Sequence, residues 1–261
     1  MPVKDYMVKK VITINKDLPL PSALDILFEY NISHLVLVDA YRRLVGIVSE
    51  KDILAKLATE RTWNVDLGKL HISSFVKSEP LFIKEKESVR RAIEIFIDEK
   101  IGILPILDDN KAVRGVITKQ DFLPLLYDNN NSLEDVLNRK PIVSFSSERF
   151  QEIRLKIVAN NISLLPVIDE ISIKGVITDI RAMQALTSFY QVVSWRYRRE
   201  RIRRLYVNDI MDRNFERVST DMDIASLARL FYEKKLKGII VVQDDAFIGL
   251  ITKTDLLKTL V

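Results

Sequence analysis

One seven-residue pattern occurs four times in the sequence, and this repetition constrains the fold more than any other feature. The pattern consists of Gly, two aliphatic residues, Ser or Thr, two variable residues and Asp, and it occupies residues 46–52, 115–121, 175–181 and 249–255. The third copy ends in Arg181 instead of Asp. An element that recurs every 60 to 74 residues in a chain of 261 residues indicates a repeat architecture.

Each copy occupies the same place in a longer run of predicted elements. In the first run, about residues 5–57, a β-segment at 11–14 precedes a helix from Pro21, a hairpin at 34–38 and 44–48, and a helix from Glu50. This β-α-β-β-α order returns at about 70–127, 132–187 and 205–261. In the later runs, residues 142–143 are predicted as a β-segment and residues 119–126 as a helix.

A single unit of roughly 55 residues buries too little surface to be stably folded alone, so we expect the units to pack in pairs. The expected fold class is α/β (α+β), with one pair at residues 1–128 and another at residues 129–261. The polar run at 128–131 has no apolar periodicity and is predicted to contain the boundary.

Composition narrows the classes of function. Hydrophobic residues make up 48% of the chain and charged residues 29%, which is typical of a soluble globular protein, and the absence of cysteine excludes disulfides and thiolate chemistry. No apolar run approaches the roughly 18 residues of a membrane helix, and the first residues lack the apolar core of a signal peptide. We therefore expect a cytoplasmic protein without membrane contact. Two histidines give no metal-site spacing, and neither a phosphate-binding loop nor a nucleophile elbow occurs. The sequence accordingly predicts no enzyme activity and no catalytic cofactor.

The order of elements, the Leu-Pro strands at 104–106 and 165–167, and the Gly-x-x-Ser/Thr-x-x-Asp ends resemble the CBS (cystathionine β-synthase) domain family. The resemblance covers nearly the entire chain. Four repeats in two CBS pairs are similar to the layout of the γ subunit of AMP-activated protein kinase and of stand-alone prokaryotic CBS proteins. The resemblance implies that adenine nucleotides bind in clefts between paired repeats. It assigns ribose and phosphate contacts to Ser49, Asp52, Thr118, Asp121, Thr252 and Asp255.

The chemistry of these residue types suits that assignment. A carboxylate accepts hydrogen bonds from both hydroxyls of a ribose, and the free N–H groups of a helix start favour a phosphate. Lys51, Lys119 and Lys253 lie in the same first turns and could add positive charge. Ser/Thr-x-x-Asp is also close to a capping box, which stabilises a helix start without binding any ligand. The two interpretations are compatible.

Other residues extend the candidate sites. The resemblance implies basic residues facing the phosphates near His34, at the start of the second strand, and Lys237 lies one residue earlier in the fourth repeat. Thr13 is a candidate for the adenine side, and its equivalents Phe82, Val143 and Arg217 differ so much that the sites are expected to be unequal. Arg181 cannot accept a ribose hydrogen bond. The altered site at Thr178 and Arg181 is therefore expected to be empty, or to hold an anion or the phosphate of a neighbouring ligand.

The sequence thus predicts a regulatory module that senses AMP, ADP or ATP and signals to an unidentified protein partner by conformational change. S-adenosylmethionine is a less favoured ligand, and association of copies through the CBS pairs is compatible with the layout. The alternative is a nucleic-acid-binding or adaptor protein that uses a basic helix at 195–204, with the CBS pairs as scaffold. Residues 196–204 contain six Arg and one Glu, whereas the whole chain carries a net charge of only +4. An apolar stripe at Leu186, Tyr190, Val193 and Tyr197 predicts one helix running into this segment, and a solvated connecting helix is the remaining interpretation.

Overall fold

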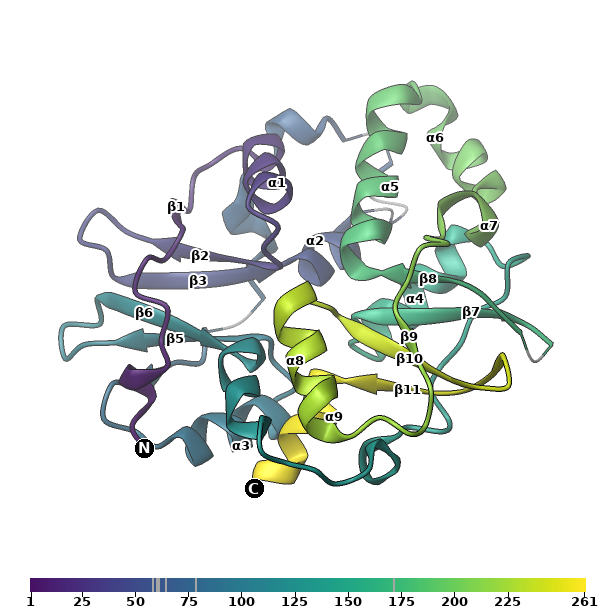
Figure 1. The fold of residues 1–261 in the computed structure, drawn as a ribbon. Helices are drawn as coiled ribbons and strands as arrows, with labels where there is room; N and C mark the ends of the chain where they lie inside the picture. The colour runs from purple at the N-terminus through teal and green to yellow at the C-terminus, as the bar shows by residue number, and fades with distance from the viewer. Residues whose placement is uncertain (58, 60–61, 64, 78, 171) are drawn as a thin grey trace. The chain divides into compact units, whose positions relative to one another are not determined.

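The computed structural model describes residues 1–57, 59, 62–63, 65–77, 79–170 and 172–261. The chain forms two compact units, Met1–Asp121 and Phe122–Val261, and each contains the strands of two of the four repeats (Figure 1). The expected mixed α/β fold of paired repeats is confirmed. Leu123 and Leu126 are buried in a hydrophobic core of the second unit, whereas the boundary expected near residues 128–131 stays a prediction.

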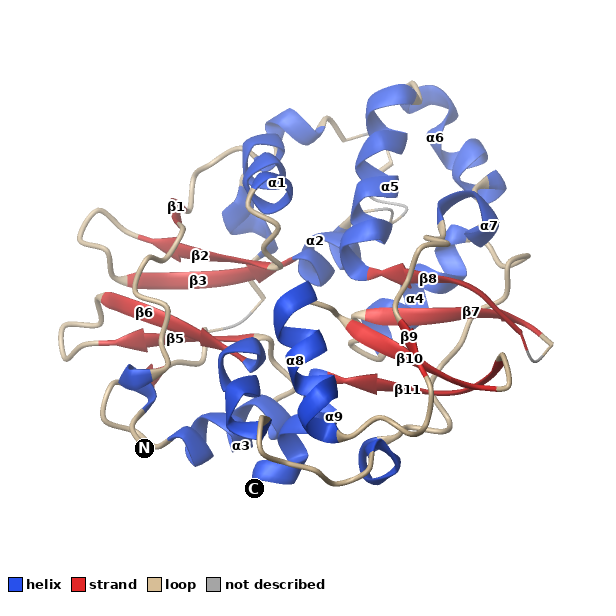
Figure 2. Cartoon of the chain, viewed as in Figure 1, coloured by secondary structure: helices blue, strands red, loops and turns tan. Residues whose placement is uncertain are grey.

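In the first unit, the short helices and strands follow the order that the sequence pattern predicts (Figure 2). The first repeat contains β1 (Thr13–Asn15), α1 (Leu20–Glu29), β2 (His34–Val38), β3 (Leu44–Ser49) and α2 (Glu50–Lys56). The second contains β4 (Ile83–Lys84), α3 (Val89–Asp98), β5 (Ile103–Leu107) and β6 (Val113–Thr118). Short 3-10 helices occur at Val3–Asp5, Leu67–Lys69, Ile72–Phe75 and Lys119–Leu126. The helix expected at 119–126 is present as a 3-10 helix, and its internal Pro124 lacks the N–H that an α-helix interior needs.

The second unit repeats this plan with one long insertion between its repeats. Its third repeat contains a 3-10 helix (Leu133–Val136), α4 (Phe150–Ala159), β7 (Leu164–Asp169), β8 (Ser172–Thr178) and α5 (Asp179–Val192). The insertion contains α6 (Trp195–Arg201) and a 3-10 helix (Ile202–Arg204). The fourth repeat contains α7 (Val207–Ile210), β9 (Arg217–Val218), α8 (Ile224–Lys234), β10 (Gly238–Gln243), β11 (Ala246–Thr252), α9 (Lys253–Leu257) and a 3-10 helix (Lys258–Leu260).

Three repeats build the same small mixed sheet. The first strand pairs parallel with the second, and the second pairs antiparallel with the third, in the orders β1-β2-β3, β4-β5-β6 and β11-β10-β9. The third repeat differs, because the β-segment expected at 142–143 is irregular and Ser144 forms a single parallel bridge to Val167. Its sheet therefore consists of β7 and β8.

The helix that precedes each hairpin ends in the same backbone conformation. Asn31, Lys100, Asn161 and Lys235 follow the four helices with φ between 49° and 54°. This left-handed residue ends the helix and directs the chain into the hairpin. Asn adopts the conformation readily, and the two lysines show that the tertiary structure imposes it on ordinary residues as well.

The hairpins of a pair pack on each other and form a shared core. In the first unit this core contains Val36, Ile103, Val113 and Val116, and in the second it contains Leu164, Val176, Ile240 and Leu250. Both sets combine residues from two repeats. Each repeat therefore buries its hairpin only with the other member of its pair, as the small size of one repeat requires.

The glycine of the seven-residue pattern has a packing role that links the two repeats of a pair. The segment leading into one repeat crosses the last strand of the other: Val8 bridges to Val116, Asp212 to Val176, and Asn138 to Leu250. A Cβ at Gly249 would lie 2.6 Å from the carbonyl oxygen of Asn138. Glycine is needed here because another backbone approaches closely.

We predict that Gly249→Ala lowers the free energy of unfolding by about 1–3 kcal/mol, because a methyl group would force the Asn138 backbone away and disturb its hydrogen bonds. Gly46→Ala is the matched comparison, since the three atoms nearest to its Cβ would all belong to the side chain of Val76, the closest at 2.8 Å, and a side chain can shift without breaking backbone hydrogen bonds. Urea denaturation of the whole chain measures both changes. Equal losses for the two variants would contradict the backbone-crossing explanation.

Candidate functional site

The first copy of the pattern forms a complete capping box where β3 runs into α2. The backbone N and the Oγ of Ser49 donate to Oδ2 of Asp52 over 2.7 and 2.6 Å, and the backbone N of Asp52 donates to the Ser49 Oγ over 3.2 Å. The cap satisfies the N–H groups that a helix start leaves open. The structural interpretation of this motif is therefore correct, and it leaves the second carboxylate oxygen outside the cap.

The second and fourth copies have the same geometry. The backbone N and hydroxyl of Thr118 donate to Oδ2 of Asp121 over 2.7 and 2.9 Å, and those of Thr252 donate to Oδ2 of Asp255 over 3.0 and 2.6 Å. In all three intact copies one oxygen of the carboxylate stabilises the helix start. The other oxygen, Oδ1, is the one that the motif leaves to further donors.

In two copies a lysine side chain forms an ion pair with this second oxygen. Nζ of Lys77 lies 2.7 Å from Oδ1 of Asp52, and Nζ of Lys258 lies 3.0 Å from Oδ1 of Asp255. The lysine side chains are 58% and 56% exposed, so the ion pairs contribute little net stability. A hydroxyl-bearing ligand could share or replace either ammonium group at small cost.

In the third copy Thr178 still accepts the hydrogen bond of a helix cap, whereas Arg181, which replaces the Asp, contacts another segment. Oγ1 of Thr178 accepts from the backbone N of Arg181 over 3.2 Å, as in an ordinary N-cap. Nε of Arg181 donates to the carbonyl oxygen of Ile210 over 2.8 Å and so connects α5 with α7. The guanidinium therefore has a structural contact within the second unit, and the expectation that this site is empty or holds an anion stays a prediction.

Lys237, which was expected to contact a phosphate, forms an ion pair with a buried carboxylate. Its Nζ lies 3.1 Å from Oδ1 of Asp179, the first residue of α5, which is 3% exposed. Sequence reasoning missed Asp179, although an acidic residue directly after the cap is a favourable partner for a helix start. This ion pair connects the two repeats of the second unit and offsets the charge of Lys237.

The remaining expected residues lie close to the motif. His34 is the cross-strand partner of Ser49, and its imidazole packs so closely on Gly102 that a Cβ there would lie 2.4 Å from its Cε1. Lys253 donates from Nζ to the carbonyl oxygen of Leu236 over 2.8 Å. Two further lysines, Lys51 and Lys119, are half-buried in the first turns after the cap, and Thr13 lies in β1 in register with Val36.

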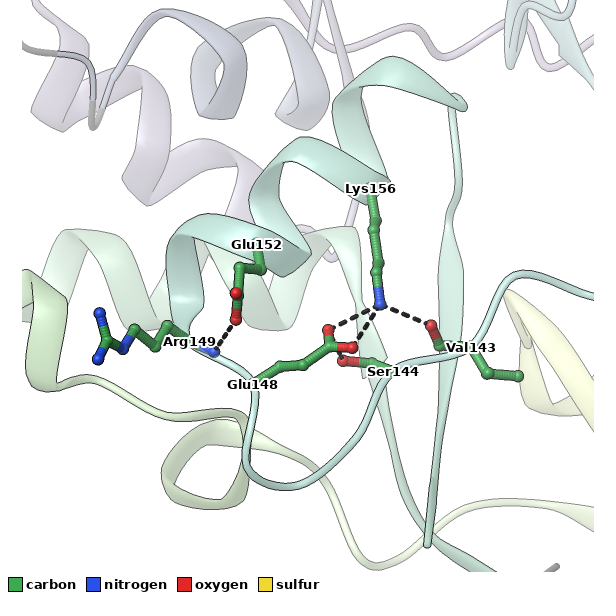
Figure 3. A network of polar contacts seen from close by, with 6 residues as sticks. All are labelled: Val143, Ser144, Glu148, Arg149, Glu152 and Lys156. Carbon is green, nitrogen blue, oxygen red and sulfur yellow. Dashed lines mark hydrogen bonds and ion pairs between the residues drawn. The ribbon is translucent and has the colours of Figure 1, made fainter. Parts of the chain in front are cut away.

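A polar network in the third repeat was not expected from the sequence (Figure 3). Nζ of Lys156, on α4, donates to both carboxylate oxygens of Glu148 over 2.7 Å and to the carbonyl oxygen of Val143 over 2.9 Å. The hydroxyl of the fully buried Ser144 donates to Glu148 over 2.7 Å. The network holds the irregular segment before α4 by side-chain bonds.

The strand registers show which residues of the other repeats occupy the positions of this network. Ser144 occupies the position of the buried Ile14, Ile83 and Val218 of the other repeats. Lys156, five residues before the left-handed residue that ends its helix, corresponds to Ile26, Ile95 and Leu230. Aligning the four repeats position by position would have revealed these substitutions.

A second basic residue of α4 is also in an apolar position. Arg154 is 8% exposed and corresponds to the buried Leu24, Ile93 and Ala228. Burial lowers the pKa of its guanidinium, while the nearby Tyr190 raises it. An arginine remains charged at neutral pH despite such a shift. The third repeat therefore differs from the others in its interior as well as in its motif.

We predict that Lys156→Met lowers the free energy of unfolding by about 1–3 kcal/mol, because Glu148 loses a charged donor in a partly buried site. The combined variant Ser144→Ile, Glu148→Leu and Lys156→Ile supplies the residues of the first repeat and should unfold at a urea concentration equal to or above that of the wild type. A combined variant less stable than Lys156→Met would contradict this explanation.

Comparison with known proteins identifies the family of the chain. The family model described as the CBS domain matches residues 3–59, 72–128 and 207–261, which correspond to the first, second and fourth repeats and make up more than half of the chain. The uncharacterized protein MJ1225 of Methanocaldococcus jannaschii is 25% identical over 269 residues, covering 96% of this chain and 95% of that protein. The uncharacterized protein MJ1404 of the same organism is 23% identical over 98% of this chain, which spans 61% of MJ1404.

The solved structures agree on the fold. The crystal structure of MJ1225, named as a proposed archaeal homologue of the γ subunit of AMP-activated protein kinase, matches all of this chain with a TM-score of 0.90 at 22% identity. A conserved protein from Pyrococcus horikoshii also matches over all of both chains, with a TM-score of 0.65 at 19% identity.

Within the described part of the chain, no group of three or more His, Asp or Glu residues is placed to hold a metal ion. The helices of the described ranges include none with the length and apolar character needed to cross a membrane. Because the family model matches three of its repeats and more than half of its length, the chain belongs to the CBS domain family.

Proposed function

We propose that this protein is a non-enzymatic regulatory module that binds adenine nucleotides, AMP, ADP or ATP, between the paired repeats of its units. The observation that carries the proposal is the split role of Asp52, Asp121 and Asp255. In each, Oδ2 is used by the helix cap, so the carboxylate is held in place before any ligand arrives. Oδ1 lies outside the cap.

Such a carboxylate is a suitable acceptor for a ribose. Adjacent 2′ and 3′ hydroxyls can both donate to it, because each carboxylate oxygen has two lone pairs. Because the helix cap already holds the carboxylate in place, binding of a ligand does not have to order it, and the entropic cost of binding is lower. In the first and fourth copies the exposed lysines Lys77 and Lys258 already show that Oδ1 attracts donors.

Basic groups near the motif support a ligand that carries phosphate. His34 lies across the hairpin from Ser49 and contacts Gly102 of the other repeat, so it belongs to both repeats of the first unit. Lys51 and Lys119 lie in the first turns that follow the caps. Helix N-termini and cationic side chains together favour an anionic group.

The likeness to MJ1225 supports the same kind of role at the level of layout. That protein matches this chain over the full length of both chains and is named as a proposed archaeal homologue of the γ subunit of AMP-activated protein kinase. Nucleotide binding would regulate a protein partner only if the ligand favours one arrangement of the repeats over another. The partner would then read that arrangement.

We predict that Asp52→Ala, Asp121→Ala and Asp255→Ala each weaken AMP binding at their own site by about tenfold or more, because charge-assisted hydrogen bonds contribute about 1.5–3 kcal/mol. Isothermal titration calorimetry of the whole chain with AMP, ADP, ATP and S-adenosylmethionine measures this. Arg181→Ala should leave AMP binding intact.

Ser88→Ala is the matched control for loss of a helix cap. The Oγ of Ser88 accepts from the backbone N of Arg91 over 3.1 Å at the start of α3, outside the four motifs. This variant should lose stability comparable to the Asp variants without weakening AMP binding. If no adenine compound binds the wild type below millimolar concentration, the proposed function is wrong.

A further inference from the structure

The insertion between the third and fourth repeats has no part in the proposed nucleotide sites. We call residues 193–204 the basic arm; it contains α6 and the 3-10 helix that follows, and it extends from the end of α5 within the second unit (Figure 1). The single helix expected through this region is wrong, because α5 ends at Val192 and α6 begins at Trp195. The apolar stripe accordingly ends at Tyr190, which is buried, whereas Tyr197 is 55% exposed.

Arg198 and Arg204 form hydrogen bonds within the second unit. Arg198 donates from Nε to the carbonyl oxygen of Val193 over 2.9 Å and from Nη2 to that of Tyr190 over 2.8 Å, and its guanidinium lies 4.4 Å from the centre of the Tyr190 ring. It thus satisfies carbonyl groups at the end of α5. Arg204 pairs with Glu200 over 2.8 Å.

The other four arginines give the arm its outward charge. Arg196, Arg199, Arg201 and Arg203 are all exposed and lie within eight consecutive residues. Arg196, Arg199 and Arg203 follow a spacing of three and four, which places them near one face of a helix. Because residues 196–204 carry six Arg and one Glu in a chain of net charge +4, the rest of the protein is nearly neutral. Attraction of a polyanion is therefore concentrated on this arm.

Exposed rings alternate with these charges. Trp195 is 52% exposed and Tyr197 is 55% exposed. The guanidinium of Arg196 lies 5.4 Å from the centre of the Trp195 ring, and that of Arg201 lies 5.8 Å from the centre of the Tyr197 ring. The arm thus presents aromatic faces next to cations.

We propose that the basic arm binds single-stranded nucleic acid, with the four exposed arginines on phosphates and Trp195 and Tyr197 stacked on bases. A single strand carries one phosphate for each base, so its charges and flat rings alternate as the arm's arginines and aromatic rings do. An acidic polypeptide would match the arginines and leave the two exposed rings without a complementary flat surface. This binding is independent of the nucleotide sites proposed above.

Fluorescence anisotropy of labelled 20-nucleotide oligo(U) and oligo(dT), titrated with the whole chain in about 50 mM salt, tests the proposal. We expect dissociation constants in the micromolar range and a slope of log K against log salt near −3, from about four phosphate contacts at about 0.7 each. Comparing the two oligomers distinguishes RNA from DNA preference.

Three variants separate charge, stacking and fold. The combined change Arg196→Gln, Arg199→Gln, Arg201→Gln and Arg203→Gln should weaken binding at least about tenfold and flatten the salt slope. Trp195→Ala should weaken binding about fivefold or more with the slope unchanged, since stacking is sequence-tolerant and carries no charge. Arg90→Gln with Arg91→Gln is the matched control on another exposed helix and should leave binding unaltered.

Each of the following results would overturn the proposal. No anisotropy change at low salt, or full binding by the four-arginine variant, would overturn the proposal. Binding of polyglutamate but neither oligonucleotide would identify an acidic protein segment as the occupant and likewise overturn it. Circular dichroism of each variant, together with AMP titration, verifies that the fold and the nucleotide sites are retained.

Discussion

The backbone crossing between the two members of a pair is the interaction on which each unit depends. The segment before one repeat forms a bridge with the last strand of the other, as Val8 does with Val116 and Asn138 with Leu250. Only a glycine admits a backbone at the distances observed beside Gly175 and Gly249. The crossed strand ends at the Ser or Thr that precedes the next helix. The glycine is therefore retained for packing, and the position of the candidate site follows from that packing.

Capping and binding use different atoms of the same carboxylate. Oδ2 of Asp52, Asp121 and Asp255 accepts from the backbone and hydroxyl of its own cap. A rigidly held acceptor is what a ribose site requires, so a motif that stabilises a helix can also serve as part of a binding site.

The third repeat has diverged as a whole. Its motif ends in Arg181, which reaches the carbonyl oxygen of Ile210. Its interior contains Ser144 and Lys156 in positions that are apolar elsewhere, and its first β-segment forms one bridge instead of a strand. These changes are mutually consistent, because a segment without strand pairing needs other bonds for its backbone, and Lys156 supplies one. The basic arm directly follows this repeat.

The sequence by itself determined the number of repeats, their order of elements and their pairing, because the Gly and Ser/Thr-x-x-Asp pattern and the apolar alternation are local signals. It also identified Arg181 as the departure. Tertiary structure alone decided the partners of the charged groups: Lys77 on Asp52, Lys237 on Asp179, and Lys156 on Glu148. Long flexible side chains find partners from distant segments, and no local pattern encodes that choice. The break between α5 and α6, across which Arg198 donates to the carbonyl oxygen of Tyr190, is likewise a feature that helical periodicity does not reveal.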